Sequence, residues 1–295
     1  MATQLLKPVN YKLRRGVSTT STYIFMAAFL GYFLLPLLWL VLASTKTNAG
    51  LFSTFGFWFG NNFNFFQNLK DLFAYDNGHF ALWMRNTAFY AVLASIGSSL
   101  ISALAGYAFA QYQFPGRNII FGFVLASIFV PATVFAVPLF LMMSKTGLSN
   151  TLWAVILPAL VNPFGVYLMR IYAERAVSQD LVDAARVDGA SELLIFITIV
   201  FRILAPGFVT VLLFAFVGAW NSYFLPLLLL SKSNLFLLTV GLAFWNSLAS
   251  QPGVAQVLYI LVVTGSVVAI VPVMVVFLFL QRYWQEGLSL GSIAG

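Results

Sequence analysis

Long apolar runs separated by short polar segments dominate the chain. A helix that crosses the roughly 30 Å hydrocarbon layer of a bilayer needs about 20 mainly apolar residues. The uncharged stretches therefore predict six membrane spans, at about residues 22–43, 87–109, 118–141, 151–170, 207–230 and 258–280. The sequence is expected to form an all-α polytopic membrane protein.

Two further uncharged stretches do not fit a span. Residues 235–249 form only the first part of an uncharged run that is too long for one helix, and this part ends in Asn246 and Ser247, which favours an interfacial or re-entrant piece. Residues 47–69 mix Phe with Asn, Gln and Gly. We interpret the second stretch as a loop at the membrane surface.

The placement of Lys and Arg predicts the orientation, because cytoplasmic loops carry an excess of basic residues. With the N-terminus inside, ten basic residues lie inside: Lys7, Lys12, Arg14, Arg15, Arg117, Arg170, Arg175, Arg186, Arg202 and Arg282. Five lie outside: Lys46, Lys70, Arg85, Lys145 and Lys232. We expect both termini to be cytoplasmic, with residues 1–20 as a cytoplasmic tail and residues 21–295 as one transmembrane domain. The first apolar segment is too long for a cleavable signal peptide.

Composition excludes several classes of protein. Hydrophobic residues make up 61% of the 295 positions and charged residues 8%, against about 25% charged in a soluble domain. The net charge of +7 is explained by anionic membrane lipid and needs no nucleic acid. The sequence has no Cys and one His, His79, and it has no phosphate-binding Gly-Lys-Ser/Thr loop. We therefore expect no metal site, no cofactor, no catalytic triad and no ATPase activity in this chain.

Residues 171–206 contain most of the scarce negative charge. Five of the eight acids of the chain lie between residues 173 and 194. Leu181, Ala184, Ala185 and Asp188 follow helical spacing, Gly189 stands where a helix C-cap is expected, and Glu192 suits the start of a second helix. Two short helices that meet at a glycine can enter a groove on another protein. An interfacial helix lying on lipid is the alternative.

Five sequence motifs carry a resemblance to a known family. They are Asp183-Ala-Ala-Arg-Val-Asp-Gly-Ala-Ser191, Ala105–Ala110 with Phe114–Arg117, Gly147–Thr151 running to Leu157-Pro158, Trp220-Asn221, and Gln281–Tyr283 with Gly287-Leu288 and Gly291. Over residues 86–295 the chain resembles the permeases of binding-protein-dependent ABC importers, in particular the shorter permease of the maltose-importer type. Two positions depart from the family pattern. Asp183 stands for the usual Glu, and Phe201-Arg202 for the usual Leu-Pro, which leaves the path of the second short helix open.

The resemblance implies a type I ABC importer permease fold and a set of partners. Residues 171–206 would be the coupling loop, docked in a cleft of a cytoplasmic ATPase through Asp183, Ala184, Ala185, Asp188 and Gly189. The tail residues Glu286, Gly287, Leu288 and Gly291 would also contact the ATPases. The implied assembly has a second permease subunit, two ATPase subunits that bind ATP and Mg, and an extracytoplasmic solute-binding protein. This chain would be a carbohydrate permease in the bacterial inner membrane and not an enzyme.

The same resemblance suggests where the cargo passes. Trp245, Asn246, Ser247 and Gln251 lie where the maltose type has a loop that enters the sugar cleft of the binding protein, although an aromatic belt at the bilayer surface is the alternative. Trp220, Asn221 and Asn162 either line the translocation path or pack between helices. An oligosaccharide, neutral or acidic, is the expected cargo. The alternatives are a stand-alone secondary carrier or channel, which the absence of intramembrane carboxylates disfavours, and a membrane-embedded enzyme.

Overall fold

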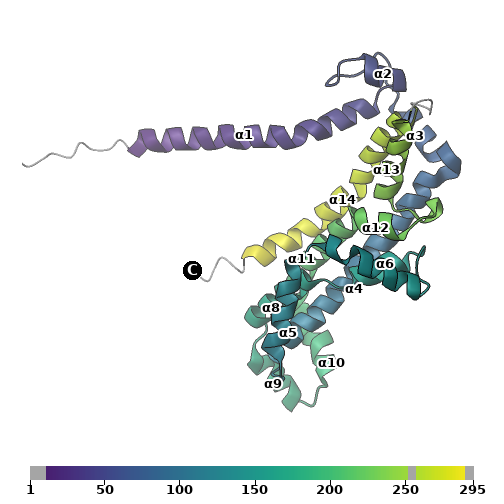
Figure 1. The fold of residues 1–295 in the computed structure, drawn as a ribbon. Coiled ribbons are helices and arrows are strands. Elements are labelled where there is room, and N and C mark those ends of the chain that lie inside the picture. The colour runs from purple at the N-terminus through teal and green to yellow at the C-terminus, as the bar shows by residue number, and fades with distance from the viewer. Residues whose placement is uncertain (1–10, 252–256, 290–295) are drawn as a thin grey trace, which may run out of the picture.

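The computed structural model of the chain describes residues 11–251 and 257–289, and in these ranges it is helical without strands (Figure 1). The helices are α1 (Tyr11–Ser44), α2 (Asn48–Ser53), α3 (Phe65–Ala74), η1 (Tyr75–Gly78), α4 (His79–Gln111), α5 (Arg117–Ile128), η2 (Ala132–Phe135), α6 (Ala136–Lys145), α7 (Trp153–Ala159), α8 (Pro163–Ala176), α9 (Gln179–Val187), α10 (Glu192–Ile195), η3 (Phe196–Val200), α11 (Phe201–Trp220), α12 (Phe224–Leu229), η4 (Ser233–Leu235), α13 (Leu238–Ala249) and α14 (Val257–Ser289).

Within the described residues, five helical segments are long and apolar enough to cross a membrane: Ser21–Ser44, Phe65–Gln111, Trp153–Ala176, Glu192–Trp220 and Leu258–Gln281. A sixth crossing is formed if α5 and α6 count as one span, although they are bent by 100° at their junction. Pro131 lies at this junction and cannot donate the backbone N–H that a continuing helix needs. The prediction of an all-α polytopic protein is confirmed.

The fifth predicted span, 207–230, does not form one helix. The continuous helical segment begins earlier, at Glu192, because α10, the π-helical turn η3 and α11 follow one another without a break as far as Trp220. No proline stands at position 202 to end the helix there, and Pro206 lies inside α11. The helix ends at Asn221, whose side-chain amide donates to the carbonyl of Val217 at 2.9 Å and so competes with the helical backbone.

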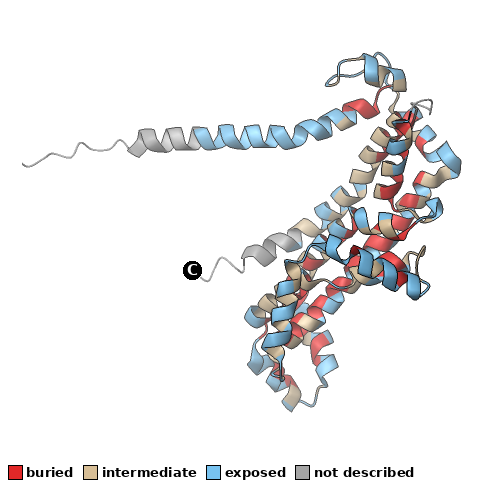
Figure 2. Ribbon diagram, in the orientation of Figure 1, coloured by how far each residue is buried: buried red, intermediate tan, exposed pale blue. Residues whose placement is uncertain are grey.

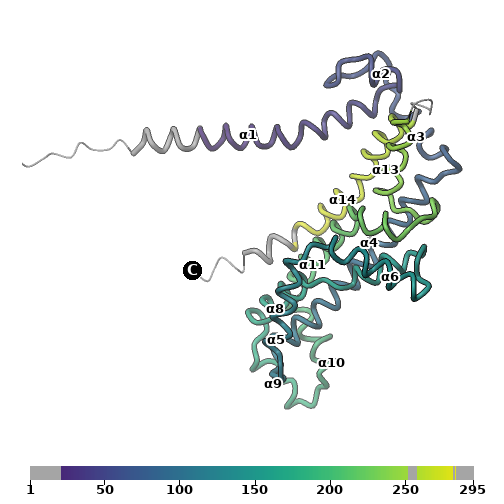
Figure 3. Tube along the Cα trace, viewed as in Figure 1, coloured from purple at the N-terminus to yellow at the C-terminus, as the bar shows by residue number. Residues whose placement is uncertain are grey.

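Two segments that the charge pattern assigns to the inner side, the turn after α4 and the loop with α9 and α10, lie together at one end of the helical body (Figure 3). Contacts at the α9–α10 end join Tyr112 to Glu192, Gln111 to Val177 and Arg117 to Glu174. Contacts at the opposite end join Trp83 to Ser233, Asn86 to Asn234 and Asn150 to Ser231. The turn after α4 and the α9–α10 loop are therefore separated in space from the predicted outer segment that contains Ser233 and Asn234.

Helix α4 packs closely against α8 because the facing side chains are small. Ser98, Ser99 and Ser102 are buried, and a Cβ atom added at Gly106 would lie 2.6 Å from the backbone nitrogen of Arg170. Only glycine fits at such a distance. Figure 2 shows the buried residues following α4 through the body of the molecule.

Helix α1 extends away from the other helices (Figures 1 and 2). Residues 21–38 are exposed along their whole length, and burial begins only near Leu42. The exposed residues are apolar, so in a membrane this surface is covered by lipid or by another protein.

A buried lysine organises the Phe-rich segment after α1. Lys46 is 1% exposed, and its Nζ donates to the carbonyl of Phe55 at 2.7 Å. The amide of Asn68 donates to the carbonyls of Ser44 and Lys46, both at 2.8 Å. Phe52, Phe55 and other rings of this loop remain exposed, whereas Lys46 is buried. No sequence pattern predicts this anchoring role of the lysine.

Candidate functional site

The predicted coupling loop forms a knob made of α9, the turn at Gly189 and α10. Gly189 has φ +82°, its N–H donates to the carbonyl of Arg186, and the N–H of Ala190 donates to the carbonyl of Ala185, each at 3.0 Å. These bonds are the Schellman arrangement that closes a helix with a left-handed residue. The predicted glycine C-cap and the start of the second helix at Glu192 are confirmed.

The knob has an inner and an outer face. Val182 and Ile195 are fully buried, and they belong to the hydrophobic cluster that includes Tyr107 of α4 and Leu204 of α11. On the outer face Val187 is 87% exposed, and Leu181, Leu193 and Leu194 are also exposed. Such a set of exposed apolar side chains on a charged loop marks a surface for a protein partner or for the membrane.

The structure corrects one of the five predicted coupling residues. Ala185 is only 8% exposed and packs into the knob's own core, because its position three residues after Val182 places both on the inner face of α9. Asp183, Ala184, Asp188 and Gly189 are exposed. Ala185 therefore supports the outer surface from within.

A network of charged groups holds the two short helices together across the glycine turn. Arg186 Nη1 lies 2.7 Å from Asp183 Oδ1, and Arg186 Nε lies 2.6 Å from Glu192 Oε1. Tyr112, which follows α4, donates its hydroxyl to the other oxygen of Glu192. We call Asp183, Arg186, Glu192 and Tyr112 the brace.

The brace perturbs the acid–base behaviour of its members. Hydrogen bonds to Glu192 and Asp183 raise the pKa of Arg186, and burial together with the bond to Glu192 raises the pKa of Tyr112. The ion pairs are partly exposed, so each contributes only about 0.2–1 kcal/mol to the stability of the fold. Together, the three bonds fix the position of α9 relative to α10 and to the end of α4. Sequence reasoning did not find Arg186 or Tyr112, although the i, i+3 spacing of Asp183 and Arg186 favours their pairing.

In the predicted binding-protein loop, Trp245 is buried, whereas the sequence predicted that it is exposed to a ligand. Trp245 is 1% exposed inside α13 and packs against Trp83, with ring centroids 4.6 Å apart, and against Tyr75. Its indole therefore belongs to the core and does not contact a ligand outside. Asn246, Ser247 and Gln251 are exposed, and the part of the predicted loop at 252–253 lies outside the described residues.

The predicted ATPase-contacting tail lies at the end of α14. Helix α14 includes positions 286–288, and Gly291 lies outside the described residues. The role of Glu286, Gly287, Leu288 and Gly291 stays a prediction.

The three candidates for the translocation path have different surroundings. Trp220 is 5% exposed, stacks on Phe216 and donates its indole N–H to the carbonyl of Ala269 on α14 at 3.1 Å, which is helix packing. Asn221 is exposed beside a cavity of about 170 Å³ that Trp220 also lines. Asn162 caps α8 by accepting from the backbone N–H of Gly165 at 2.9 Å. A second cavity opens beside it.

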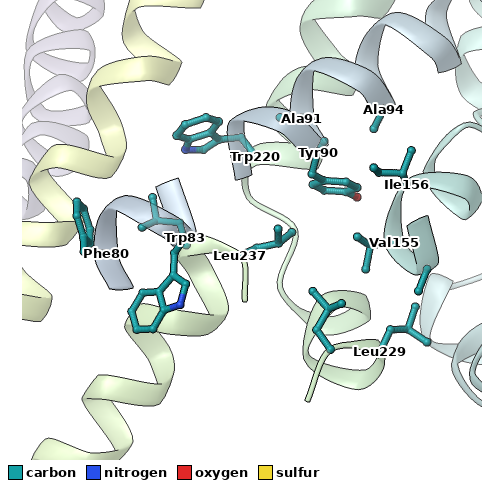
Figure 4. Close-up of a cluster of buried hydrophobic side chains, with 14 of the residues drawn as sticks. Phe80, Trp83, Tyr90, Ala91, Ala94, Val155, Ile156, Trp220, Leu229 and Leu237 are labelled. Carbon is teal, nitrogen blue, oxygen red and sulfur yellow. The ribbon is translucent and has the colours of Figure 1, made fainter. Parts of the chain in front are cut away.

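Figure 4 shows a cluster of buried hydrophobic side chains that includes Trp220 and Tyr90. Tyr90 of α4 faces Val155 and Ile156 of α7, and Trp83 lies further along the same helix. Among the described residues, no three His, Asp or Glu side chains converge in a way that could hold a metal ion.

Long apolar helices with a charged loop at one end define a polytopic membrane protein. Residues 98–289 match the family described as "Binding-protein-dependent transport system inner membrane component". The chain belongs to this family, and it is a protein of the bacterial cytoplasmic membrane.

Individual relatives agree with this assignment. The chain is 36% identical over 218 residues to an arabinooligosaccharides transport system permease protein of Halalkalibacterium halodurans, covering 74% of this chain and 76% of the relative. It is 34% identical over 280 residues to the Bacillus subtilis protein of the same description, covering 93% and 95%. A lactose transport system permease protein of Rhizobium radiobacter is 30% identical over 271 residues, covering 91% and 93%.

A solved structure has the same fold. It is a chain of a bacterial ABC transporter involved in the import of the acidic polysaccharide alginate, with a TM-score of 0.77, 21% identity, and coverage of 95% of this chain and 100% of the other. The ABC importer permease fold predicted for this chain is therefore confirmed.

Proposed function

We propose that this chain is one permease subunit of an ATP-driven importer that carries an oligosaccharide into the cytoplasm. The observation that carries the proposal is the knob, whose apolar outer face is free while its inner face is buried in the chain's own core. The descriptions of the relatives, which name arabinooligosaccharides and lactose, support a carbohydrate cargo.

The proposed docking partner of the knob is a cytoplasmic ATPase subunit. Leu181, Val187 and Leu193 offer apolar contacts, and Asp188 adds a negative charge beside them. ATP and Mg would be bound by two ATPase subunits, so this chain supplies transmission and no catalytic group. This assignment places the knob and both termini on the cytoplasmic side, which the ten-to-five excess of Lys and Arg supports.

A second permease subunit is the proposed partner of α1. The described part of this helix from residue 21 to residue 38 has an exposed apolar surface and packs on the rest of the chain only near its end. An extracytoplasmic solute-binding protein would dock at the opposite end from the knob, where Asn246, Ser247 and Gln251 are exposed. The family description names dependence on a binding protein, and the second permease subunit is what the resemblance to maltose-type importers implies.

A photo-cross-linking experiment tests the ATPase contact. A photoreactive amino acid replaces Val187 on the knob, and in a matched control it replaces Phe55, which is 74% exposed at the opposite end. In intact cells we expect the position 187 variant to capture a nucleotide-binding subunit, identified by mass spectrometry, and the position 55 variant not to do so.

Transport by the purified protein separates the proposed function from its alternative. The complex is isolated in mild detergent and reconstituted in liposomes with ATP on the knob side. We expect uptake to require ATP and the co-purified subunits. Full uptake by this chain alone without ATP would instead identify a stand-alone carrier.

A further inference from the structure

The fourth membrane-length segment is broken at a place where its backbone needs polar partners. Helix α7 ends at Ala159 and α8 begins at Pro163, which has no N–H to donate to the carbonyl of Ala159. The N–H of Gly165 is taken by the side chain of Asn162. Within the described part of the chain, no backbone donor reaches the carbonyls of Ala159, Leu160 or Val161.

Carbonyl groups without partners are tolerated at membrane depth only where they are buried in protein or line a water-filled cavity. A cavity of about 200 Å³ opens at this break. Its walls come from α4, from the break between α7 and α8, and from α11. The lining residues are Tyr90, Ala94 and Ser98 on α4, Ala159, Val161 and Asn162 at the break, and Ala215, Gly218 and Ala219 on α11. We call it the break cavity. Ala159 and Val161, whose carbonyls receive no backbone hydrogen bond among the described residues, both line it.

The lining of the break cavity favours a neutral hydroxylated ligand. The amide nitrogen of Asn162 has no acceptor among the described residues, so it is available as a donor beside the carbonyl acceptors. Tyr90 borders the cavity with its ring buried against Val155 and Ile156, and the alanines and Gly218 leave room along the other walls. A sugar ring presents its hydroxyl groups to amide donors and carbonyl acceptors. None of the described lining residues is charged, so nothing there balances an ionic cargo.

We propose that the break cavity is a subsite for one neutral sugar ring of the transported oligosaccharide. The inference rests on the proposed import function. It assigns substrate contact to this subunit itself, through Asn162 and the carbonyls of the break. The volume is below the roughly 300–1,000 Å³ of pockets that enclose drug-sized ligands, which agrees with a single ring of a longer chain.

Two substitutions change the break cavity without removing a structural contact. Asn162→Ser keeps an N-cap oxygen for α8 but removes the amide donor. Gly218→Leu fills the cavity mouth, and a Cβ atom at this position meets no atom within 4 Å. Gly122→Leu is the matched control, because position 122 on α5 is equally open and lies outside the cavity.

The assay is uptake by the reconstituted complex, with radiolabelled arabinotriose, lactose and maltotriose as probes. For a probe that the wild-type complex transports, we expect Asn162→Ser to raise the KM about three- to tenfold with little change in the maximal rate, as for one lost hydrogen bond. We expect Gly218→Leu to reduce uptake at least tenfold and Gly122→Leu to leave it unchanged. Co-purification of the other subunits checks assembly of each variant.

Different results would overturn the two proposals separately. If the wild-type complex transports a probe and both cavity variants match it in KM and rate, the break cavity is not a sugar subsite, while the import function stands. If the wild-type complex transports no probe with ATP, the proposed function itself fails. An equal loss in Gly218→Leu and Gly122→Leu would attribute the effect to helix packing and would also refute the subsite.

Discussion

Gly189 allows the geometry of the knob to be tested by a graded set of substitutions. Its φ of +82° lies in the left-handed region, and a Cβ atom added there meets no atom within 4 Å. Any effect inside the chain must therefore come from the backbone conformation and not from a steric clash. The turn also sets the distance across which Arg186 reaches Glu192 at 2.6 Å.

The size of the effect follows from the cost of the left-handed conformation. A residue with a Cβ atom pays roughly 1–2 kcal/mol there, and a β-branched residue is the least tolerated. Since 1.4 kcal/mol is about tenfold, Gly189→Val should shift the balance against the native turn by about 5- to 30-fold. Asn adopts this conformation readily, so Gly189→Asn should change it little. Gly189→Asp has a similar shape but adds a charge beside Asp188 on the docking face.

Uptake and ATP hydrolysis are measured together in proteoliposomes, with the amount of protein in the membrane as the control. We expect Gly189→Asn to be close to wild type, Gly189→Asp to hydrolyse ATP with little uptake, and Gly189→Val to lose uptake most strongly. Loss in Asn equal to that in Val would show that side-chain volume, and not φ, matters at this turn. Normal uptake by all three variants would refute the assignment of the knob as the coupling element.

Three further predictions follow from individual contacts. Tyr112→Phe removes the hydroxyl bonded to Glu192, so the amount of sugar transported per ATP hydrolysed should fall while stability drops by no more than about 1 kcal/mol. Gly106→Ala should lower the thermal stability in detergent by about 1–3 kcal/mol because its Cβ atom would meet rigid backbone, whereas Gly122→Ala should not lower it. Lys46→Met leaves a carbonyl of the Phe-rich loop unpaired, so chymotrypsin should cleave this loop faster; unchanged cleavage would contradict the anchoring role.

The sequence was sufficient for features that depend on local patterns. Spans were predicted from uncharged length, which is a property of one continuous segment, and the cap at Gly189 from its place after a helical face, which depends on one or two turns of backbone. The bend between α5 and α6 was not predicted, although Pro131 is a visible signal for it.

Features that depend on distant partners could not be predicted in the same way. Trp245 was expected at a ligand surface because Trp suits both sugar contact and a core, and only the position of Trp83, far away in sequence, decides between them. Ala185 was assigned to the wrong face of α9 because two helical faces carry small residues. The brace pairs Tyr112 with Glu192 across 80 positions, a separation that no periodicity reports.

The knob is connected to two walls of the break cavity by continuous helices. One wall belongs to α11, which follows α10 without interruption from Glu192 to Gly218 and beyond, about 40 Å at 1.5 Å per residue. The other belongs to α4, whose end is tied to the same Glu192 through Tyr112. Because α11 continues the backbone of Glu192 and α4 is bonded to the carboxylate of that residue through Tyr112, we expect a displacement of the knob to move both walls together. The third wall is interrupted between Ala159 and Pro163, so we expect the cavity to change shape at this break.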